Sequence, residues 1–384
     1  MNRTADPPLG RLSVDDFLAR HWQRRPLLVR GALGSEAAPL DANALLALAA
    51  RDDVESRLVG QRRGGGWSLA HGPFDADALP PRARRRWTLL VQGVDLHADA
   101  AARLMARFAF VPHARLDDLM MSFATDGGGV GPHVDSYDVF LIQAQGRRRW
   151  RIGRPGRHAF VPGLPLRILD RFEPTDEWVL EPGDLLYLPP GWPHEGVALG
   201  ECTTCSVGFR APSPGELVAA FLADAADGPI EPGARFADPG RARARRPGQV
   251  PADLKAFARE AIGGWRPSDG QIDAFLGRWL TEPKAQVFFD PPARALLPEA
   301  FALRARAGLA LDRRTRLLVD AGSVYVNGEH ERAARGERAW LARLADRRAL
   351  DAAQATRALA VPALAGRLHD WWRAGWLHLD PGGA

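Results

Sequence analysis

The sequence predicts an α+β fold with three consecutive parts, which we place at residues 1–212, 213–290 and 291–384. Three observations predict this division. The first part carries apolar, β-prone runs that end in glycine and proline turns. The second part shows helical periodicity, and the third places an alternating hairpin pattern between helical segments. With 384 residues the chain is long enough for two or three hydrophobic cores.

The first part contains two potential metal ligands, His133 and Asp135, in the segment GGGVGPHVDSYDVFLIQ. On a strand, residues two apart point to one face, so we expect His133, Asp135 and Tyr137 to face a common point. The apolar run VFLIQ that follows favours a strand buried on both sides. An isolated H-x-D pattern recurs by chance, and by itself it favours a hydrogen-bonded histidine beside a surface acid.

A second histidine, His194, ends a motif rich in glycine and proline. Gly183, Pro189, Gly191 and His194 follow the order G-x5-P-x-G-x2-H. This order resembles the second motif of the cupin superfamily, in which a strand, a tight turn and a second strand place a histidine inside a small β-barrel. Two imidazoles and one carboxylate form the facial triad that binds Fe(II) and leaves coordination positions open. The two motifs together predict a metal-binding cupin and an iron-dependent oxygenase.

A basic residue after the first motif predicts the kind of cupin. The segment Gly146-Arg147-Arg148-Arg149-Trp150 resembles the G-x-K-x-W step of JmjC hydroxylases, whose basic residue pairs with the distal carboxylate of 2-oxoglutarate. Arg148 keeps that chemistry, because a guanidinium can hold a carboxylate through two parallel hydrogen bonds. Arg147 and Arg149 would then point to the other face. The alternative is a basic hairpin end with three solvated arginines.

Four further segments extend the resemblance: DDFLARHWQRRPLLVRG, DDLMMSF at 117–123, GPHVDSYDVF, and PHEG followed by SVGFRAP. They look like the bacterial ribosomal oxygenases, JmjC-type hydroxylases that act on an arginine of ribosomal protein L sixteen. The resemblance covers the whole chain and implies a JmjC double-stranded β-helix (cupin) barrel, a helical dimerisation region and a C-terminal winged-helix domain. It also implies Fe(II), 2-oxoglutarate and O2 as reactants, and hydroxylation at the β-carbon of the arginine.

The same resemblance implies which side chains bind the metal and the co-substrate. The iron ligands fall on His133, Asp135 and His194. The residues implied for 2-oxoglutarate are Arg148 and, on the strand after the distal histidine, Ser206 with Thr204 as a second candidate.

The resemblance places the substrate arginine between Tyr137 and Met120, with Asp118 as its acidic partner. Strand alternation agrees, because Asp118, Met120 and Ser122 would share one face while Asp117 faces outward. A buried guanidinium needs a carboxylate partner, and an aromatic face adds a cation–π contact. The alternative for Asp118 is that it merely begins a strand.

The second part predicts helices and a linker. Ser213-Pro214-Gly215-Glu216 predicts a capping box with proline at the first helical position, before the helix ELVAAFLADAA. Two more amphipathic helices are predicted around 252–262 and 269–281. Their apolar faces need a partner, which the resemblance implies is the second subunit of a homodimer; these residues are Leu254, Phe257, Ile262, Ile272, Phe275 and Trp279.

Between these helices, the stretch from about 227 to 251 is rich in proline, glycine and arginine. It predicts a solvated linker, with binding of ribosomal RNA as the alternative. The arginines concerned are Arg241, Arg243, Arg245 and Arg246.

The last part predicts a winged helix. TRLLVDAGSVYVNGEH alternates apolar and polar residues around Ala321-Gly322-Ser323, with Asn327-Gly328 as a second turn. Helical segments flank this hairpin. Winged helices often bind DNA, but we find no concentrated basic recognition helix, so we expect packing or partner recognition and no direct binding of nucleic acid.

The composition limits the possible location, partners and metal sites of the protein. No apolar run is long enough to cross a bilayer, and the N-terminus lacks a secretory hydrophobic region. The net charge of +5 would suggest acidic partners, but arginine and alanine are abundant throughout and Lys255 and Lys284 are the only lysines, so we attribute the charge to genome composition. Cys202 and Cys205 lack two further zinc ligands; we expect reduced strand residues and a cytoplasmic protein.

Three other functions stay open on the sequence alone. A JmjC demethylase would use the same iron centre on a methylated side chain. A metal-binding cupin with isomerase or storage activity would have no need for Arg148. A non-catalytic RNA or ribosome-assembly module would bind its target equally well without His133.

Overall fold

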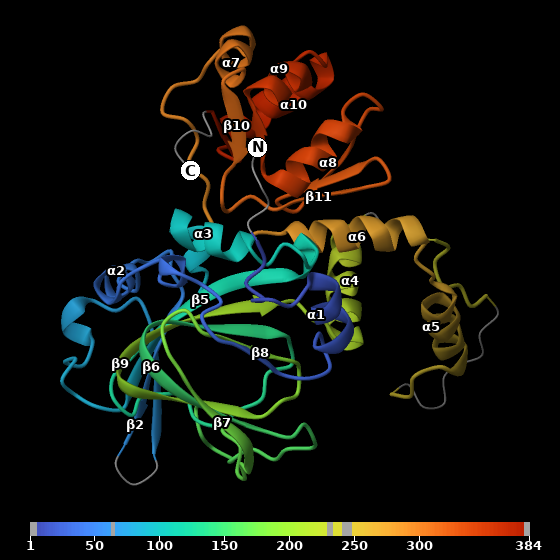
Figure 1. Cartoon of the computed structure of the whole chain (residues 1–384). Coiled ribbons are helices and arrows are strands. Elements are labelled where there is room, and N and C mark those ends of the chain that lie inside the picture. The colour runs from blue at the N-terminus through green and yellow to red at the C-terminus, as the bar shows by residue number, and fades with distance from the viewer. Residues whose placement is uncertain (1–5, 63–65, 229–232, 240–247, 380–384) are drawn as a thin grey trace.

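The computed structural model describes residues 6–62, 66–228, 233–239 and 248–379 (Figure 1). The first part of the chain is mostly β. Its strands are β1 (Leu27–Val29), β2 (Ser56–Gln61), β3 (Trp67–His71), β4 (Trp87–Val91), β5 (Leu116–Ala124), β6 (Val139–Gly153), β7 (Pro174–Leu180), β8 (Leu185–Leu188) and β9 (His194–Phe209). Its α-helices are α1 (Val14–Arg20), α2 (Ala42–Leu48) and α3 (Asp99–Ala106), with short 3-10 turns at Ser35–Ala37, Ala76–Ala78, Val94–Leu96 and His113–Arg115.

These strands form one sheet in the order β1-β8-β6-β9-β5-β4-β2-β3, with β7 paired to β6. Strands β6 and β9 are the longest, and they run antiparallel along the barrel with register shifts between Gln143 and Arg147. Gly146 has a φ of 65°, so the strand turns at a residue without a side chain. This arrangement confirms the predicted α+β fold with a cupin barrel.

Aromatic side chains close the outer face of the barrel. Phe17 of α1 is fully buried, and its ring centroid lies 5.0 Å from that of Tyr187 and 5.6 Å from that of Phe140. The Tyr187 hydroxyl donates to the buried carboxylate of Asp138 at 2.6 Å. Because Asp138 directly precedes β6, this contact fixes the point where the chain enters the barrel. The inner face remains for the functional cavity.

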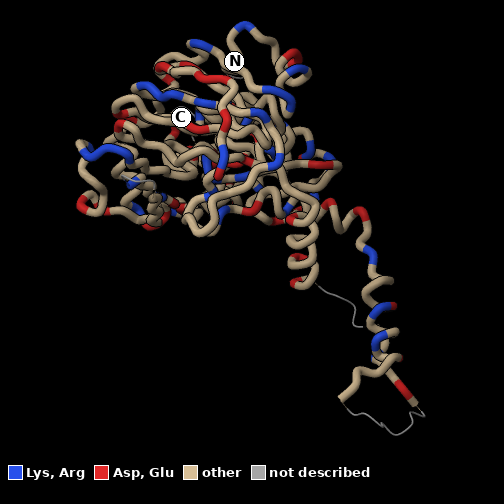
Figure 2. Tube along the Cα trace, turned by 90° about the horizontal axis from the view of Figure 1, so that it is seen from below, with Lys and Arg blue, Asp and Glu red and all other residues tan. Residues whose placement is uncertain are grey.

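The second part contains α4 (Pro214–Asp227), α5 (Ala252–Gly264) and α6 (Asp269–Thr281). The capping box at Ser213 and Glu216 is confirmed: each side chain bonds the other residue's backbone N–H. In Figures 1 and 2, α5 stands apart from the rest of the molecule. One expectation was wrong: Phe275 is only 4% exposed, because it packs on Phe221 of α4 within the same chain. The four arginines expected in the linker lie outside the described residues.

The third part has its own apolar core, which includes the buried side chains of Leu341, Leu368 and Trp371. It contains α7 (Pro298–Ala305), α8 (Arg338–Arg347), α9 (Ala352–Leu359) and α10 (Pro362–Arg373). Its strands are β10 (Gly308–Leu311), β11 (Leu317–Asp320), β12 (Ser323–Val326), β13 (Glu329–Arg332), β14 (Ala349–Asp351) and β15 (Leu377–Leu379). Both predicted turns are present, with positive φ at Ala321-Gly322 and Asn327-Gly328.

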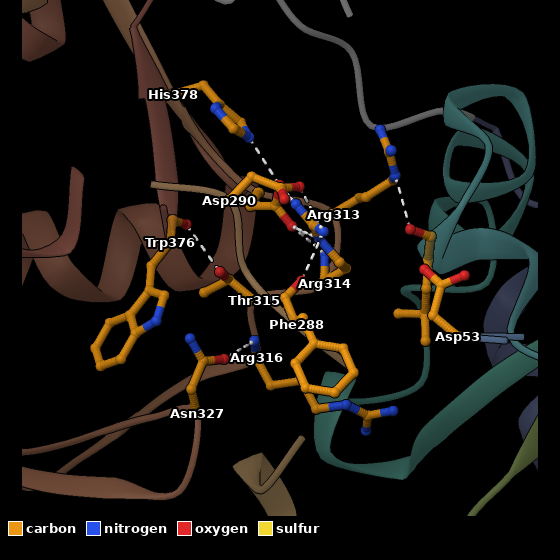
Figure 3. Close-up of polar contacts among 12 residues, drawn as sticks. Asp53, Phe288, Asp290, Arg313, Arg314, Thr315, Arg316, Asn327, Trp376 and His378 are labelled. Carbon is orange, nitrogen blue, oxygen red and sulfur yellow. Dashed lines mark hydrogen bonds and ion pairs between the residues drawn. The ribbon is translucent and has the colours of Figure 1, made fainter. Parts of the chain in front are cut away.

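A loop before β11 attaches this third part to the barrel (Figure 3). Arg313 donates to the Leu96 carbonyl at 2.8 Å and to Asp99 at 2.6 Å. Arg316 donates to the Asp117 carbonyl at 2.8 Å. The C-terminal part is therefore held directly against β5, the strand that carries Asp118 and Met120. Figure 2 shows basic and acidic residues interleaved along the chain. No described helix is long and apolar enough to span a bilayer.

Candidate metal centre and active site

His133, Asp135 and His194 converge as predicted. Their ligand atoms all lie within 4.8 Å of one another. Nε2 of His194 is 3.6 Å from one oxygen of Asp135, and Nε2 of His133 is 3.9 Å from the other. Two nitrogens and a carboxylate at these separations match the donor set of the facial triad.

The two imidazoles are anchored with one nitrogen free. Nδ1 of His133 lies 2.9 Å from the Gly131 carbonyl, and Nδ1 of His194 lies 2.9 Å from the Trp192 carbonyl. Because a carbonyl accepts only from N–H, Nδ1 carries the proton and Nε2 keeps its lone pair towards Asp135. Burial and the neighbouring His133 lower the pKa of His194 to about 4, so this ring is neutral at neutral pH. The residues present therefore fit a divalent metal.

The main chain sets the distance between the ligands, although these residues do not form the strand that the sequence predicted. His133 and Asp135 do not lie on a strand; His133 forms an isolated bridge with His194, and Asp135 follows in an irregular segment before β6. The Asp135 carbonyl accepts from the N–H of Gly191 at 2.8 Å. The strand prediction failed because Gly131, with a φ of 78°, and Pro132 interrupt the ladder just before His133.

All nine predicted site residues line one cavity of about 530 Å³ inside the barrel. They are His133, Asp135, His194, Arg148, Ser206, Thr204, Asp118, Met120 and Tyr137. Sheet register explains much of this convergence, because Met120 of β5 pairs with Ser206 of β9, and Ser122 pairs with Thr204. Side chains on adjacent strands at paired positions share one face.

Arg148 is the buried cation of this cavity, with 5% of its surface exposed. Among the described residues, none accepts a hydrogen bond from its Nε or Nη2. Its guanidinium carbon lies 5.7 Å from the centre of the Trp150 ring. A buried guanidinium without an anion is costly, so this position fits the carboxylate of a bound ligand. Arg147 is exposed, as the alternation of the strand predicts, whereas Arg149 is half-buried.

The two hydroxyl candidates differ in their partners. The Thr204 hydroxyl lies 3.4 Å from the amide oxygen of Gln143 and donates to it. Within the described part of the chain, no group bonds the Ser206 hydroxyl, which lines the cavity. Ser206 is therefore the freer of the two to bind a ligand.

The predicted substrate residues line the same cavity. Asp118 is buried, Met120 is half-buried, and Tyr137 is 40% exposed. Gly208 separates Asp118 from Tyr137: a Cβ added to it would lie 3.9 Å from Asp118 Oδ1 and 3.9 Å from Tyr137 Cε2. A carboxylate oxygen and an aromatic ring thus border the same small space, as a cation requires.

Sequence reasoning missed several polar residues in and around this cavity. Lys284 Nζ lies 3.2 Å from Asp118 Oδ2, although the two residues are far apart in the chain. Its rarity, as one of two lysines, was the only signal in the sequence. On β2, on β4 and directly after β4, three buried polar atoms of the cavity also lack partners among the described residues; they are Arg57 Nε, Thr88 Oγ1 and Gln92 Oε1.

Comparisons with known proteins agree with this geometry. Residues 103–217 match the JmjC domain, and residues 266–378 match the ROXA-like winged helix. The chain is 37% identical to the ribosomal protein uL16 3-hydroxylase of Escherichia coli strain K12, over 83% of this chain and 85% of that protein.

Solved structures of E. coli YcfD are similar as well. The X-ray structure has a TM-score of 0.81 at 34% identity, covering 96% of this chain and 99% of the other. The structure of the ribosomal oxygenase YcfD in complex with cobalt and 2-oxoglutarate has a TM-score of 0.79, with the same identity and coverage.

These matches confirm the predicted JmjC domain and the predicted winged helix. The similarity to the E. coli structure extends over the barrel, the helices and the C-terminal part. In this chain, one cavity contains both the metal triad and Arg148, whose Nε and Nη2 have no partner among the described residues. The chain belongs to the bacterial ribosomal oxygenases, a family of JmjC-domain, 2-oxoglutarate-dependent oxygenases.

Proposed function

We propose that this protein hydroxylates the β-carbon of an arginine side chain in a large-subunit ribosomal protein, and that this protein is uL16. The name of the E. coli relative supports the substrate. The observation that carries the proposal is the pairing of Asp118 Oδ1 and the Tyr137 ring across Gly208, in the cavity that also contains the metal triad. A carboxylate and an aromatic face together select a cationic, flat group such as a guanidinium.

In this proposal His133, Asp135 and His194 hold Fe(II), which together with 2-oxoglutarate and O2 supplies the oxidising chemistry. Arg148 binds the distal carboxylate of 2-oxoglutarate through its unpaired nitrogens, and Ser206 adds a hydrogen bond from its hydroxyl. Thr204 remains the second candidate for that hydrogen bond. These residues orient the co-substrate and leave the hard chemistry to the metal.

Asp118, Met120 and Tyr137 orient the substrate. Asp118 Oδ1 accepts hydrogen bonds from the guanidinium, while Tyr137 and Met120 lie along its two faces. Burial raises the pKa of Tyr137, so its hydroxyl stays protonated and the ring stays neutral. A neutral, electron-rich ring attracts the cation without adding a charge that would need its own partner.

The proposal is tested by incubating the protein with Fe(II), 2-oxoglutarate, O2 and a uL16 peptide that contains the candidate arginine, followed by mass spectrometry. We expect one oxygen atom to be gained on that arginine, and none on a matched peptide with lysine in its place. Turnover of 2-oxoglutarate without a gain in peptide mass would keep the oxygenase and overturn the substrate. Loss of a methyl group from a methylated peptide would favour the demethylase instead.

We also propose that residues 213–290 form a homodimerisation region between an oxygenase domain at 1–212 and a winged-helix domain at 291–384. The support is apolar surface on all three helices of this region. Its exposed side chains include Val218 and Leu222 of α4, Phe257 and Ile262 of α5, and Ile272 and Leu276 of α6. Light scattering should give a dimer mass that falls to the monomer mass in Phe257→Glu/Ile262→Glu; a wild-type monomer would contradict the proposal.

A ribosomal protein substrate would also place the protein in the cytoplasm. Cys202 and Cys205 are both buried in β9, as expected for strand residues. Burial raises the pKa of the Cys205 thiol, so it is a poor nucleophile.

A further inference from the structure

The two oxygens of Asp118 have different surroundings. Oδ2 accepts a hydrogen bond from the Gly93 N–H at 3.1 Å and from Lys284 Nζ at 3.2 Å. Oδ1 accepts none from the described residues, and it borders the space beside Tyr137 across Gly208. One oxygen is therefore held by the protein, and the other is left for a ligand.

Lys284 reaches Asp118 from the C-terminal half of the chain. It lies between α6 and α7, outside the residues that match the JmjC domain and inside those that match the ROXA-like winged helix. Arg210 fixes the end of α6 by donating to the Leu280 carbonyl at 2.8 Å. On the other side of α6, the Thr281 hydroxyl accepts from the Gly328 N–H at 3.2 Å. The segment that carries Lys284 is thus anchored to both the barrel and the winged helix.

We propose that Lys284 is a positioning residue for the substrate arginine, which holds Asp118 Oδ2 so that a charged Oδ1 faces the cavity. The inference rests on the proposed arginine hydroxylation and deepens it, because it makes the C-terminal half of the chain part of the substrate site. Lys284 acts through Asp118; its own ammonium bonds the oxygen that points away from the open space.

The charges around Asp118 explain why it needs this lysine. The acids Asp117 and Asp95 lie close by, and the bases Arg210 and Arg316 lie beyond them. Burial raises the pKa of Asp118, and Asp117 raises it further, whereas the ammonium of Lys284 is the largest opposing influence. Removing Lys284 therefore raises that pKa again. A protonated Asp118 offers a guanidinium neither a charge nor two acceptor lone pairs.

The opposite role for Lys284 makes the opposite prediction. If the ammonium stood in the place of the substrate guanidinium, the substrate would have to displace it, and removing it would tighten substrate binding. If Lys284 positions Asp118, removing it weakens substrate binding. The sign of the change in peptide affinity separates the two roles.

The experiment compares Lys284→Met with Lys284→Arg in the full-length protein. Lys255→Met is the matched control, because Lys255 is the other lysine and lies exposed on α5. Affinity for the uL16 arginine peptide is measured by anisotropy with 2-oxoglutarate and a redox-inert divalent metal, from about pH 6 to pH 9. KM for 2-oxoglutarate is measured in parallel.

We expect Lys284→Met to weaken peptide binding about tenfold or more at neutral pH, as the loss of a charge-assisted contact does. The loss should be largest at low pH, and the pH at which affinity is half-maximal should rise. KM for 2-oxoglutarate should stay unchanged, Lys284→Arg should retain most of the affinity, and Lys255→Met should match the wild type. Tighter binding in Lys284→Met, or equal binding at every pH, would overturn the inference.

A second measurement needs no substrate and separates this inference from the proposed function. Lys284→Met is compared in the wild type and in an Asp118→Asn background by thermal unfolding. We expect it to lower Tm more where Asp118 is present, since the pair is then broken with one charge left buried. In the Asp118→Asn background only the exposed ion pair of Lys284 with Asp117 Oδ1, at 3.7 Å, is lost. An equal effect in both backgrounds would overturn the charge pairing. If Tm shows that Lys284 and Asp118 are coupled but the wild-type protein does not bind the uL16 peptide, the proposed substrate is overturned and the charge pairing is kept.

Discussion

His133 and His194 bind each other through their backbones. The N–H of His133 donates to the His194 carbonyl at 3.0 Å, and the N–H of His194 donates to the His133 carbonyl at 2.9 Å. The spacing of the two imidazoles is therefore set by main-chain atoms, which no side-chain substitution removes. Variants that lose a metal ligand should keep the frame of the site, so their loss of activity can be interpreted as loss of the metal.

Asp135→Ala should abolish turnover and lower metal affinity by more than about 100-fold, because loss of an outer-shell partner alone costs about 10- to 100-fold and Asp135 would be a direct ligand. Metal affinity is measured by calorimetry with Co(II), and activity by consumption of 2-oxoglutarate. Asp176→Ala, which removes an exposed acid on β7, is the control and should leave both unchanged. An active Asp135→Ala protein would remove Asp135 from the triad.

Arg148→Met should raise the KM for 2-oxoglutarate roughly 30- to 1000-fold, since two charge-assisted hydrogen bonds contribute about 2 to 4 kcal/mol. Arg148→Lys should lose less, because it keeps the charge but only one donor direction. The control is Arg147→Met, one residue away on the exposed face of β6. Steady-state kinetics measure the effect; an unchanged KM in Arg148→Met would mean that another residue binds the carboxylate.

Tyr137→Ala should weaken peptide binding by about 0.5 to 2 kcal/mol, or roughly 2- to 30-fold, through loss of the cation–π contact. Tyr137→Phe should retain the affinity, because the ring and not the hydroxyl meets the guanidinium. Binding is measured by calorimetry, with the KM for 2-oxoglutarate as an internal control that stays constant. Equal losses in the two variants would assign the effect to the hydroxyl.

Asp95 should make folding stability depend on pH. Burial raises its pKa to about 6, with Asp118 adding to the effect, from an ordinary value of 3.8. A carboxyl whose folded pKa is raised favours the native state when protonated, so this contribution is lost as pH rises from about 4 to about 6.

Asp95→Asn removes the charge and keeps an oxygen to accept from the Leu119 N–H, a bond of 2.8 Å. At neutral pH we expect a Tm higher by roughly 2 to 6 °C, with the gain shrinking near pH 5. Thermal unfolding at the two pH values measures this. A gain that is the same at both would assign the effect to packing instead of charge.

The convergence of His133, Asp135, His194 and Arg148 on one cavity was predictable, because each lies in a short motif that resembles a known family's motif. The backbone conformation of residues 133–137 was not predicted correctly. His133, Asp135 and Tyr137 reach one cavity from an irregular segment and not from a strand face, so the correct convergence was expected for the wrong structural reason. Gly131 and Pro132, which interrupt the ladder, are the residues in the sequence that argue against a strand at this position.

Contacts between distant segments were beyond the sequence. The Lys284–Asp118 pair joins residues from different parts of the fold, and no periodicity or motif announces it. Phe275 is a second example. Its helical pattern correctly predicted an apolar face, but the pattern does not say which surface covers that face, which is Phe221 of the same chain. Periodicity predicts that a side chain is buried, but only the three-dimensional structure shows which residues it packs against.

Gly208 gives the cavity a property of its own. A methyl group at this position would make only ordinary van der Waals contact with Asp118 and Tyr137, so the empty protein tolerates it. The same methyl group takes up width that a guanidinium needs between the carboxylate and the ring. A substitution of Gly208 by alanine would therefore restrict which substrate side chains the cavity accepts. It would do so without lowering the stability of the folded protein.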